Sequence, residues 1–237
     1  MSKIAIIIPT FNELENIEKL VKGIKRFLPK VSIFIVDDTN NQEIKYLLYS
    51  KKLKINYFHR KNSSGRGSAV LYGLRKAIKN EYDIFIEMDA DYSHNPNELI
   101  RNIKFFKKNK LDLLIGSRYL LQSKIINWNF SRKILSASAN FLVKNLLKIN
   151  INDFTNGYRF YSKRAVKKII SRCGNIGEGF IILSEIIVVI KNNNFKIDEI
   201  PTIFVNRKRG KSAVNFRLIL ESLIGLLKLF MIKKKLY

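Results

Sequence analysis

Two carboxylates separated by a single residue have the chemistry of a metal-ion site. Asp89 and Asp91 follow a run of strand-forming residues at 84–88, and Pro96 then begins a predicted helix. Open α/β sheets bind ligands at the carboxyl ends of their strands. Because carboxylates together with phosphate oxygens hold hard cations such as Mg²⁺, the Asp-Ala-Asp turn indicates a metal-bridged phosphate ligand. A solvated turn after a strand is the alternative interpretation.

Other predicted strand ends also carry charged groups. Glu13 lies just after the first strand, Asp37 and Asp38 end the second, and Arg118 follows a later one. The carboxyl ends of parallel strands lie along one edge of a sheet. The sequence therefore predicts a single crevice in which several acidic groups and an arginine converge.

The elements that must position these groups alternate between strand and helix. Continuous apolar runs such as 4–8 are typical of strands covered on both faces, and apolar stripes at helical spacing lie between them. This order predicts an α/β fold with a mostly parallel, doubly wound sheet flanked by helices. The predicted strands are 4–8, 31–36, 54–58, 84–88, 111–115 and 197–205, with a short strand at the end of the loop 153–161, and the predicted helices are 14–28, 42–50, 64–79, 97–108, 131–147, 162–171, 180–191 and 216–237.

Two helix starts carry specific polar signals. Asn12 is predicted to cap the first helix, with Glu15 completing a pattern like a capping box. Gly65 and Gly67 open a later helix, and glycines before a helix start let backbone amides approach an anion. Their spacing matches neither a P-loop nor the dinucleotide-binding fingerprint, so a plain helix entry is the alternative there.

The charge of the chain restricts its partners. Lys and Arg number 44 against 19 Asp and Glu, a net charge of +25. This excess suits an anionic lipid surface, a nucleic acid or a diphosphate-bearing substrate. Because the lysines are spread along the chain and no nucleic-acid-binding motif accompanies them, no nucleic acid is expected.

Cysteine content and hydropathy bear on the compartment. Cys173 is the only cysteine, so an internal disulfide is excluded and a structural thiol in a reducing cytosolic compartment is expected. The chain enters a strand at 4–8 without the pattern of a signal peptide. No apolar run reaches the length of a membrane-spanning helix.

Polar groups in the second half of the chain mark further candidate positions. Arg132 and Ser136 lie one turn apart on one face of a predicted helix. Glu185 interrupts an apolar helix, where a carboxylate is costly unless it is paired or placed in a polar site, and a site position is favoured over a solvated one. The basic loop at 206–212 suits phosphate, with a solvated surface loop as the alternative.

The C-terminal tail is predicted to form an amphipathic helix. Arg217, Glu221, Gly225 and Lys228 fall on one narrow stripe, and large apolar residues fill the rest. Residues 218–232 would span about 22 Å as a helix, short of the roughly 30 Å hydrocarbon core of a bilayer. We therefore expect an interfacial helix whose lysine-rich end favours anionic headgroups. A helix docked on the domain or on a membrane-embedded partner subunit is the alternative.

Several motifs in a fixed order resemble one enzyme family. They are Pro-Thr-Phe-Asn-Glu-x2-Asn at 9–16, Val-Asp-Asp at 36–38, Met-Asp-Ala-Asp-Tyr-Ser-His-x-Pro at 88–96, Gly-Ser-Arg-Tyr at 116–119, Trp-x3-Arg-Lys-x2-Ser-x3-Asn at 128–140, Asp-x-Thr-x2-Tyr-Arg-x-Tyr at 153–161, and Glu-Ile-Pro at 199–201 leading to Arg-x2-Gly-x-Ser at 207–212. This order resembles the dolichyl-phosphate mannose synthases, within the inverting family 2 glycosyltransferases of GT-A (Rossmann-like) fold. The resemblance covers almost the whole chain, and the motifs at 128–140 and 207–212 are its most specific part.

The resemblance implies roles for particular residues. Asp89 and Asp91 would hold Mg²⁺ or Mn²⁺, while Arg132 and Ser136 would hold the lipid phosphate. The expected catalytic residues are Asp91 and Arg118, with Asp91 positioning metal and sugar without accepting a proton. The expected donor-binding residues are Pro9, Phe11 and Glu13 at the nucleotide, Val36 and Asp38 at base and ribose, Asp89, Ala90 and Asp91 at the metal and donor, and Arg118 and Arg207 at phosphate groups.

Three departures from the family pattern affect these expectations. Phe11 replaces a common tyrosine, which removes a hydroxyl contact and leaves stacking. Ala213 replaces the usual lysine after the serine of the last loop, so one phosphate contact is in doubt. Ile182 and Leu183 replace the usual Phe-Gln, which bears on the acceptor side or the sugar pocket.

The resemblance implies an inverting enzyme that moves mannose from GDP-mannose to dolichyl or another polyprenyl phosphate. Residues 1–212 would form the catalytic domain, and 213–237 a helix that associates with a membrane or a small anchoring subunit. The expected location is the cytoplasmic face of a membrane, the endoplasmic reticulum in a eukaryote or the plasma membrane in a prokaryote. A polyprenyl-phosphate transferase with another donor, such as UDP-glucose, is the nearest alternative. A non-catalytic basic protein that binds membrane or RNA is the alternative from a different class.

Overall fold

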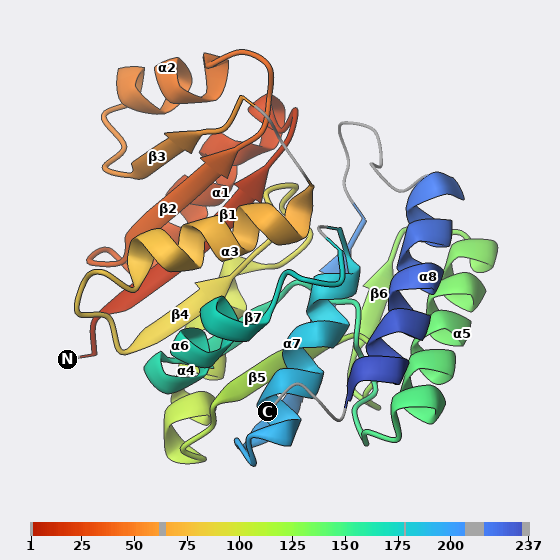
Figure 1. The fold of residues 1–237 in the computed structure, drawn as a ribbon. Coiled ribbons are helices and arrows are strands. Elements are labelled where there is room, and N and C mark those ends of the chain that lie inside the picture. The colour runs from red at the N-terminus through yellow and green to blue at the C-terminus, as the bar shows by residue number, and fades with distance from the viewer. Residues whose placement is uncertain (1, 62–64, 178, 207–215, 234–237) are drawn as a thin grey trace.

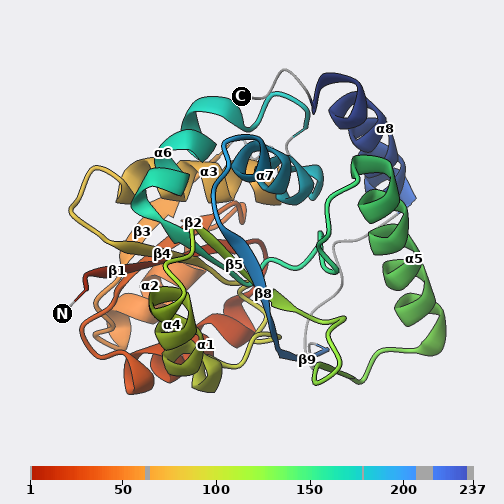
Figure 2. The same ribbon diagram turned by 90° about the horizontal axis from the view of Figure 1, so that it is seen from below.

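A seven-stranded sheet lies between two layers of helices (Figures 1 and 2). The computed structural model describes residues 2–61, 65–177, 179–206 and 216–233 of the 237-residue chain, with the backbone alone described at 216–220. The strand order is β3-β2-β1-β4-β7-β5-β8, and only β7 runs antiparallel to its neighbours. The strands are β1 (Ile4–Thr10), β2 (Ser32–Asp37), β3 (Asn56–His59), β4 (Ile84–Glu87), β5 (Leu113–Ser117), β7 (Arg159–Ser162) and β8 (Ile197–Pro201). The expected α/β fold with a mostly parallel sheet is confirmed.

The helices divide between the two faces of the sheet (Figure 2). One face is covered by α1 (Leu14–Phe27), α2 (Glu43–Ser50) and α4 (Leu99–Lys108). The other face is covered by α3 (Arg66–Ala77), α6 (Lys163–Arg172) and α7 (Ile181–Asn192). Two further helices, α5 (Phe130–Leu147) and α8 (Phe216–Ile232), lie side by side at one end of the molecule (Figure 1).

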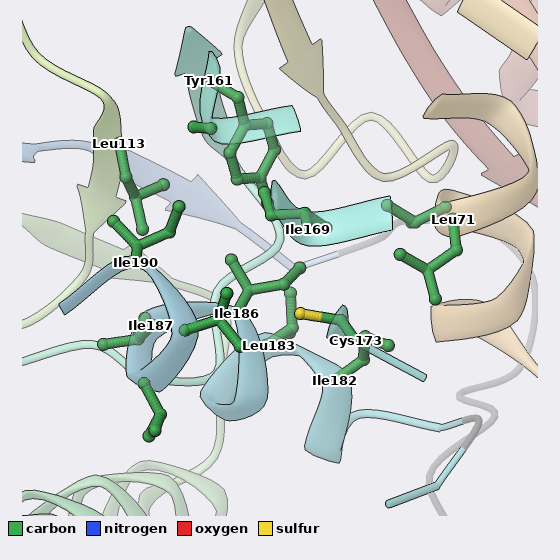
Figure 3. Packing of buried hydrophobic residues seen from close by; sticks show 14 of the residues in the cluster. Leu71, Leu113, Tyr161, Ile169, Cys173, Ile182, Leu183, Ile186, Ile187 and Ile190 are labelled. Atoms are coloured by element: carbon green, nitrogen blue, oxygen red, sulfur yellow. The ribbon is translucent and has the colours of Figure 1, made fainter. Parts of the chain in front are cut away.

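The apolar strands contribute to two hydrophobic cores, one on each face of the sheet, because successive side chains point to opposite faces. In β1, Ile6 and Ile8 pack under α1 and α2, while Ala5 and Ile7 pack under α3. Cys173 lies in this second core among residues of α7 (Figure 3). Burial, together with the nearby Glu185 carboxylate, raises the pKa of its thiol well above the usual value. The expectation of a structural thiol is confirmed.

The predicted capping of the first helix is wrong. Asn12 does not cap α1, because its own backbone is left-handed, with φ of 57°, and its N–H donates to Thr39 Oγ1. The N-cap residue is Glu13, which makes no side-chain capping hydrogen bond. At α6, by contrast, the N-cap residue Ser162 does make a capping hydrogen bond, since its Oγ accepts from the Ala165 N–H.

The predicted strand at 197–205 is two strands in different sheets. β8 ends at Pro201, and β9 (Ile203–Val205) pairs with β6 (Lys124–Ile126), a strand that the sequence pattern did not predict. The break falls at Thr202, whose hydroxyl donates to Glu98 and whose N–H donates to the carbonyl of Ser117. Glu98 belongs to the 3₁₀ turn η1 (Pro96–Glu98), which precedes α4.

The C-terminal helix docks on the domain by a narrow face. Gly225, Leu226 and Leu229 are buried, and a Cβ at Gly225 would press on Ile181 of α7. The opposite face of α8 exposes large apolar side chains. No helix in the described ranges is both long enough and apolar enough to cross a bilayer.

Candidate active site

The carboxyl ends of β1, β2, β4 and β5 lie at one edge of the sheet, as predicted. Antiparallel β7 begins at this edge, because Arg159 pairs with both Glu87 and Ile115. The loop before β7, which begins at Asp153, is therefore brought to the same edge. This loop adds polar side chains to the edge, among them Asp153 and Asn156, which contact Arg118 and His94.

The acidic turn after β4 is held by its own backbone and by a buried histidine. Asp91 Oδ1 accepts from the Ser93 N–H at 3.0 Å, and Tyr92 between them has a φ of 62°. His94 Nδ1 accepts from the Asp89 N–H at 3.3 Å, so Nε2 carries the proton and donates to Asn156 Oδ1 at 2.9 Å. The turn is thereby fixed to the loop before β7.

Arg66 at the start of α3 pairs with Asp89 as well as with Glu87. Its Nε and Nη2 lie 2.9 and 2.6 Å from Asp89 Oδ1, and its Nη1 lies 2.6 Å from Glu87 Oε1. Glu87 is fully buried and also accepts from the Tyr161 hydroxyl at 2.6 Å. Burial acts to lower the pKa of Arg66, but the two carboxylates outweigh it and raise the pKa. Arg66 is therefore a permanent cation inside the acidic turn.

The two carboxylates after β2 have different partners. Asp37 is fully buried and accepts from Thr10 Oγ1, the Thr39 N–H and the Tyr57 hydroxyl. Asp38 accepts two hydrogen bonds from Arg60, at 2.7 and 2.6 Å. Asp37 thus ties β1, β2 and β3 together, whereas Asp38 lies at the sheet edge with its charge balanced by an arginine.

The other predicted nucleotide residues surround the end of β1. Pro9 and Val36 are buried partners in the β1–β2 register, whereas Phe11 is 52% exposed. Glu13 is buried and accepts from Asn16 Nδ2 at 2.8 Å. A cavity of about 230 Å³ lies between the starts of α1 and α2, and its lining is Asn12, Leu14, Glu15, Asn16, Thr39, Asn41, Glu43 and Ile44.

Arg118 after β5 forms a buried ion pair with Asp153. Its Nε and Nη2 donate to the two Asp153 oxygens at 2.8 Å each, and Nη2 also donates to Thr155 Oγ1 at 2.7 Å. Burial acts to raise the pKa of Asp153, but the guanidinium outweighs it and lowers the pKa. The pair locks the β5 end to the loop before β7.

The two predicted acceptor residues lie on α5 and join the Arg118 cluster. Trp128 contacts two guanidinium groups, with ring-to-Cζ distances of 5.4 Å for Arg118 and 4.3 Å for Arg132. Arg132 Nη1 donates to Asn206 Oδ1 at 3.0 Å, and Ser136 Oγ accepts from the Tyr119 hydroxyl at 2.6 Å. A chain of direct contacts therefore connects α5 to the sheet edge.

Glu185 and Arg207 complete the predicted positions. Glu185 is fully buried in α7; one oxygen accepts from the Gly174 N–H, while the other has no hydrogen-bond partner in the described structure. Burial raises the pKa of Glu185. Arg207 and the basic loop around it lie outside the described residues, as does Ala213.

Sequence reasoning missed several residues that organise this edge. The contacts of Arg66, Glu87, Asp153 and Gly157 were not predicted, although each lies in a segment that the motifs include or adjoin. One signal was available for Arg66: a basic residue directly after a glycine at a helix start, close to a cluster of strand-end acids. Nothing local indicated that Asp153 would pair with Arg118, since their separation in sequence is 35 residues.

The donor set of the acidic turn suits a hard divalent cation. Asp89 and Asp91 offer carboxylate oxygens, and a Mg²⁺-like ion takes its remaining ligands from water and substrate phosphate. No group of three or more His, Cys, Asp or Glu side chains within the described ranges could hold a metal ion by itself. A metal bound here would therefore share its coordination with a ligand.

Comparison with known proteins places the chain among sugar-transferring enzymes. Residues 5–170 match the family described as Glycosyl transferase family 2. A polyprenol monophosphomannose synthase of Mycolicibacterium smegmatis is 33% identical over 222 residues, covering 92% of this chain and 83% of that protein. An undecaprenyl-phosphate mannosyltransferase of Micrococcus luteus is 28% identical over 227 residues, covering 94% and 92%.

Solved structures agree on the fold. The crystal structure of glucosyl-3-phosphoglycerate synthase from Mycobacterium tuberculosis with UDP has a TM-score of 0.69 at 12% identity, covering 97% of this chain and 80% of that one. The same enzyme in complex with Mn²⁺, UDP and glucosyl-3-phosphoglycerate gives a TM-score of 0.68. The expected GT-A fold is confirmed, and so is the expectation of an enzyme. The chain belongs to glycosyltransferase family 2 and is a glycosyltransferase.

Proposed function

We propose that this enzyme transfers mannose from GDP-mannose to dolichyl phosphate or another polyprenyl phosphate. The observation that carries the proposal is the continuous edge from Asp89 and Asp91, past the Arg118–Asp153 pair, to Arg132 and Ser136 on α5. Both curated relatives are named for mannose and for a polyprenol or polyprenyl-phosphate substrate, which supports the same conclusion.

For the donor we assign the nucleotide to the ends of β1 and β2. The exposed ring of Phe11 is available to stack on a base, and Glu13 and Asp38 offer carboxylate acceptors near Pro9 and Val36. Ala90 is buried between the two aspartates and lies where the sugar diphosphate would approach. Arg207, from outside the described residues, is assigned to phosphate on the family resemblance alone.

Mg²⁺ or Mn²⁺ is the cation that we assign to Asp89 and Asp91. When bound, such an ion supplies Lewis-acid stabilisation of the negative charge on the departing nucleotide diphosphate. We assign Arg118 to stabilisation of the same charge, because Asp153 orients its guanidinium and, against the opposing effect of burial, raises its pKa, with a smaller contribution from Asp89.

The acceptor phosphate needs little help from a base. Its second pKa is near 6, so at neutral pH it is mostly a dianion whose oxygen can attack the anomeric carbon directly. The new bond joins that oxygen to the anomeric carbon as the bond to the donor diphosphate breaks, which inverts the configuration. Arg132 and Ser136 would hold the attacking phosphate, and Asp91 would orient metal and sugar without taking a proton.

The exposed apolar face of α5 and α8 supports action at a membrane. The two helices lie side by side (Figure 1). Both expose large apolar side chains, and on α8 these recur at helical spacing on the side away from Leu226 and Leu229. Exposed lysines, among them Lys133 and Lys228, accompany them, as suits anionic headgroups. The apolar side chains are Phe130, Ile134, Leu135, Phe141 and Leu142 on α5 and Leu223, Ile224, Leu227, Phe230 and Met231 on α8.

We assign residues 1–212 to catalysis and 213–237 to this membrane contact, because α8 adds mainly apolar surface beside the acceptor helix. The acceptor is a lipid, so the enzyme must act at a bilayer surface. Its cytoplasmic face is proposed, the endoplasmic reticulum membrane in a eukaryote or the plasma membrane in a prokaryote. A small membrane subunit seated on the same apolar face would serve equally as an anchor.

The donor is tested by direct competition. Purified enzyme is incubated with polyprenyl phosphate, Mg²⁺ or Mn²⁺, and labelled GDP-mannose, UDP-glucose or UDP-N-acetylglucosamine in turn. Lipid-extractable label is expected from GDP-mannose. If lipid-extractable label appears only with a UDP-sugar, that sugar and not mannose is the one transferred. If no donor gives lipid-extractable label, transfer to a lipid phosphate is contradicted.

Arg132→Gln is expected to weaken acceptor binding. Losing one charge-assisted contact to phosphate costs about 1.5–3 kcal/mol, so the KM for polyprenyl phosphate should rise about tenfold or more while the KM for GDP-mannose stays constant. Steady-state kinetics at varied acceptor concentration measure this. Lys104→Gln, an exposed cation on α4, is the matched control, and equal effects from both variants would argue against an acceptor role for Arg132.

Phe141→Ser combined with Met231→Ser should reduce membrane binding. The two side chains are 72% and 77% exposed on neighbouring helices. Burial of each apolar side chain in a bilayer interface contributes on the order of 1 kcal/mol, so the loss of both should lower partition onto anionic phospholipid vesicles about thirtyfold. Tyr46→Ser on α2, 68% exposed, controls for general loss of surface apolarity. Vesicle sedimentation that is unchanged in the double variant would sink this assignment.

A further inference from the structure

One of the two proposed metal carboxylates, Asp89, already pairs with a cation of the protein itself. Arg66 donates twice to Asp89 Oδ1 and once to Glu87 Oε1, at distances of 2.6–2.9 Å. Its side chain is only 14% exposed. A guanidinium cannot be deprotonated in proteins, so Arg66 carries its charge into this site at every physiological pH.

Neighbouring residues restrict the position of the Arg66 side chain. It is the first residue of α3, directly after Gly65, whose φ of 100° is a conformation that favours glycine. On the other side, a Cβ built on Gly157 would overlap the Arg66 guanidinium. Glu87 in turn is fixed from β7 by the Tyr161 hydroxyl. These residues therefore hold one guanidinium group in place beside Asp89.

The guanidinium at this position reduces the negative charge that a divalent cation would experience at the acidic turn. Within the described ranges, the protein offers no group of three or more metal-binding side chains, and Arg66 offsets one of the carboxylate charges at the turn. A free cation therefore finds few ligands and a weakened negative field. A nucleotide diphosphate brings both oxygen ligands and negative charge to the same place.

We propose that Arg66 makes divalent-cation binding at Asp89 depend on the nucleotide diphosphate. The proposal rests on the metal and donor sites assigned above. In the absence of nucleotide, the guanidinium balances the charge of Asp89, and the metal binds weakly. When the diphosphate is present, its negative charge allows both the guanidinium and the metal ion to be bound at the turn. By linkage, the metal must strengthen nucleotide binding by the same factor. Arg66 acts here as a positioning residue and does not contact the reacting atoms.

The test measures Mn²⁺ affinity with and without GDP, with no turnover. Removing Arg66 alone would leave Glu87 buried beside no cation, which is strongly destabilising. The informative comparison is therefore Glu87→Gln against the double variant Arg66→Gln with Glu87→Gln. Both keep a side chain that can accept from Tyr161, and they differ only in the guanidinium.

The double variant is expected to bind Mn²⁺ about tenfold more tightly than Glu87→Gln in the absence of GDP, the order expected of one charge removed near a partly hydrated ion. The enhancement of Mn²⁺ affinity by GDP should shrink by a similar factor. Gly157→Ala adds a Cβ that would displace the guanidinium without deleting it and would also lie 3.0 Å from Asp89 Oδ1. It should shift both values in the same direction as the double variant, and it is the deciding variant if the double variant does not fold, because disturbance of Asp89 alone would weaken Mn²⁺ binding. Arg75→Gln, an exposed arginine in the last turn of α3 and away from the acidic turn, should change neither.

Equal coupling between GDP and Mn²⁺ in Glu87→Gln, the double variant and Gly157→Ala would overturn the role of Arg66, while the donor and metal sites would stand. Wild-type protein that binds no Mn²⁺ even with GDP would instead contradict the metal site of the proposed function. Looser Mn²⁺ binding in the double variant would also overturn the inference, because it would make Arg66 a support for the metal.

Discussion

Asp91→Asn should lower kcat for mannosyl transfer by about 10²–10³-fold, the loss typical when a group that stabilises transition-state charge is removed. The substitution is nearly isosteric, and an asparagine oxygen can still accept from the Ser93 N–H that Asp91 Oδ1 now binds at 3.0 Å. The turn should therefore keep its shape and lose only charge. The rate is measured as lipid-extractable mannose formed at saturating donor and acceptor.

Asp198→Asn provides the matched control, since Asp198 is an exposed carboxylate on β8. It should leave the rate unchanged. The pH profile of residual activity in Asp91→Asn separates the two possible roles of the carboxylate. A profile parallel to that of the wild type fits metal positioning, whereas intact metal affinity with activity that rises steeply with pH would make Asp91 a general base and refute the role given to it.

Asp153→Asn should cost about 3–5 kcal/mol of unfolding free energy, because it leaves the buried Arg118 guanidinium without a counter-charge. Both side chains of the pair are almost inaccessible, at 6% and 0% exposure. Urea unfolding at neutral pH measures the loss. Glu18→Gln, which breaks the exposed Lys22–Glu18 pair on α1, should give no measurable change.

The pH dependence of this loss has a definite sign. The folded state holds the pKa of Asp153 below its usual value of 3.8, so the unfolded chain takes up the proton first as the solution is acidified. The stabilisation is complete above the usual value and disappears as the pH falls through the depressed folded-state value. The difference between wild type and Asp153→Asn should therefore shrink in that acidic window. A difference that persists unchanged there would mean that the ion pair is not its source.

Much of the fold was predictable because local pattern and burial agree. The isoleucine-rich run of β1 is buried on both faces, and the stripe of α1 faces the sheet. The break at Thr202 and the antiparallel entry of β7 were not predictable in the same way. Both depend on partners distant in sequence, Glu98 for the hydroxyl of Thr202 and β4 with β5 for β7.

The candidate site shows the same difference between features that follow from local sequence and features that depend on residues distant in sequence. Residues in motifs at strand ends, such as Asp38 and Asp89, lie at the predicted edge because strand direction alone places them there. Their partners could not be found by local pattern. The pairing of β3 with β2 brings Arg60 to Asp38, and the packing of α3 against the sheet brings Arg66 to Asp89. A motif identifies the candidate side chain, whereas the residue that balances its charge is set by the tertiary fold.

We propose above all that the enzyme transfers mannose to a lipid phosphate at the sheet edge that bears Asp89 and Asp91. The most direct measurement incubates purified enzyme with labelled GDP-mannose and Mn²⁺, with and without polyprenyl phosphate, and follows label in the organic phase. We expect a lipid-linked mannose of inverted configuration that requires both the acceptor and the metal and is absent for Asp91→Asn. Label that never enters the organic phase, or that enters it equally with Asp91→Asn, would contradict this claim.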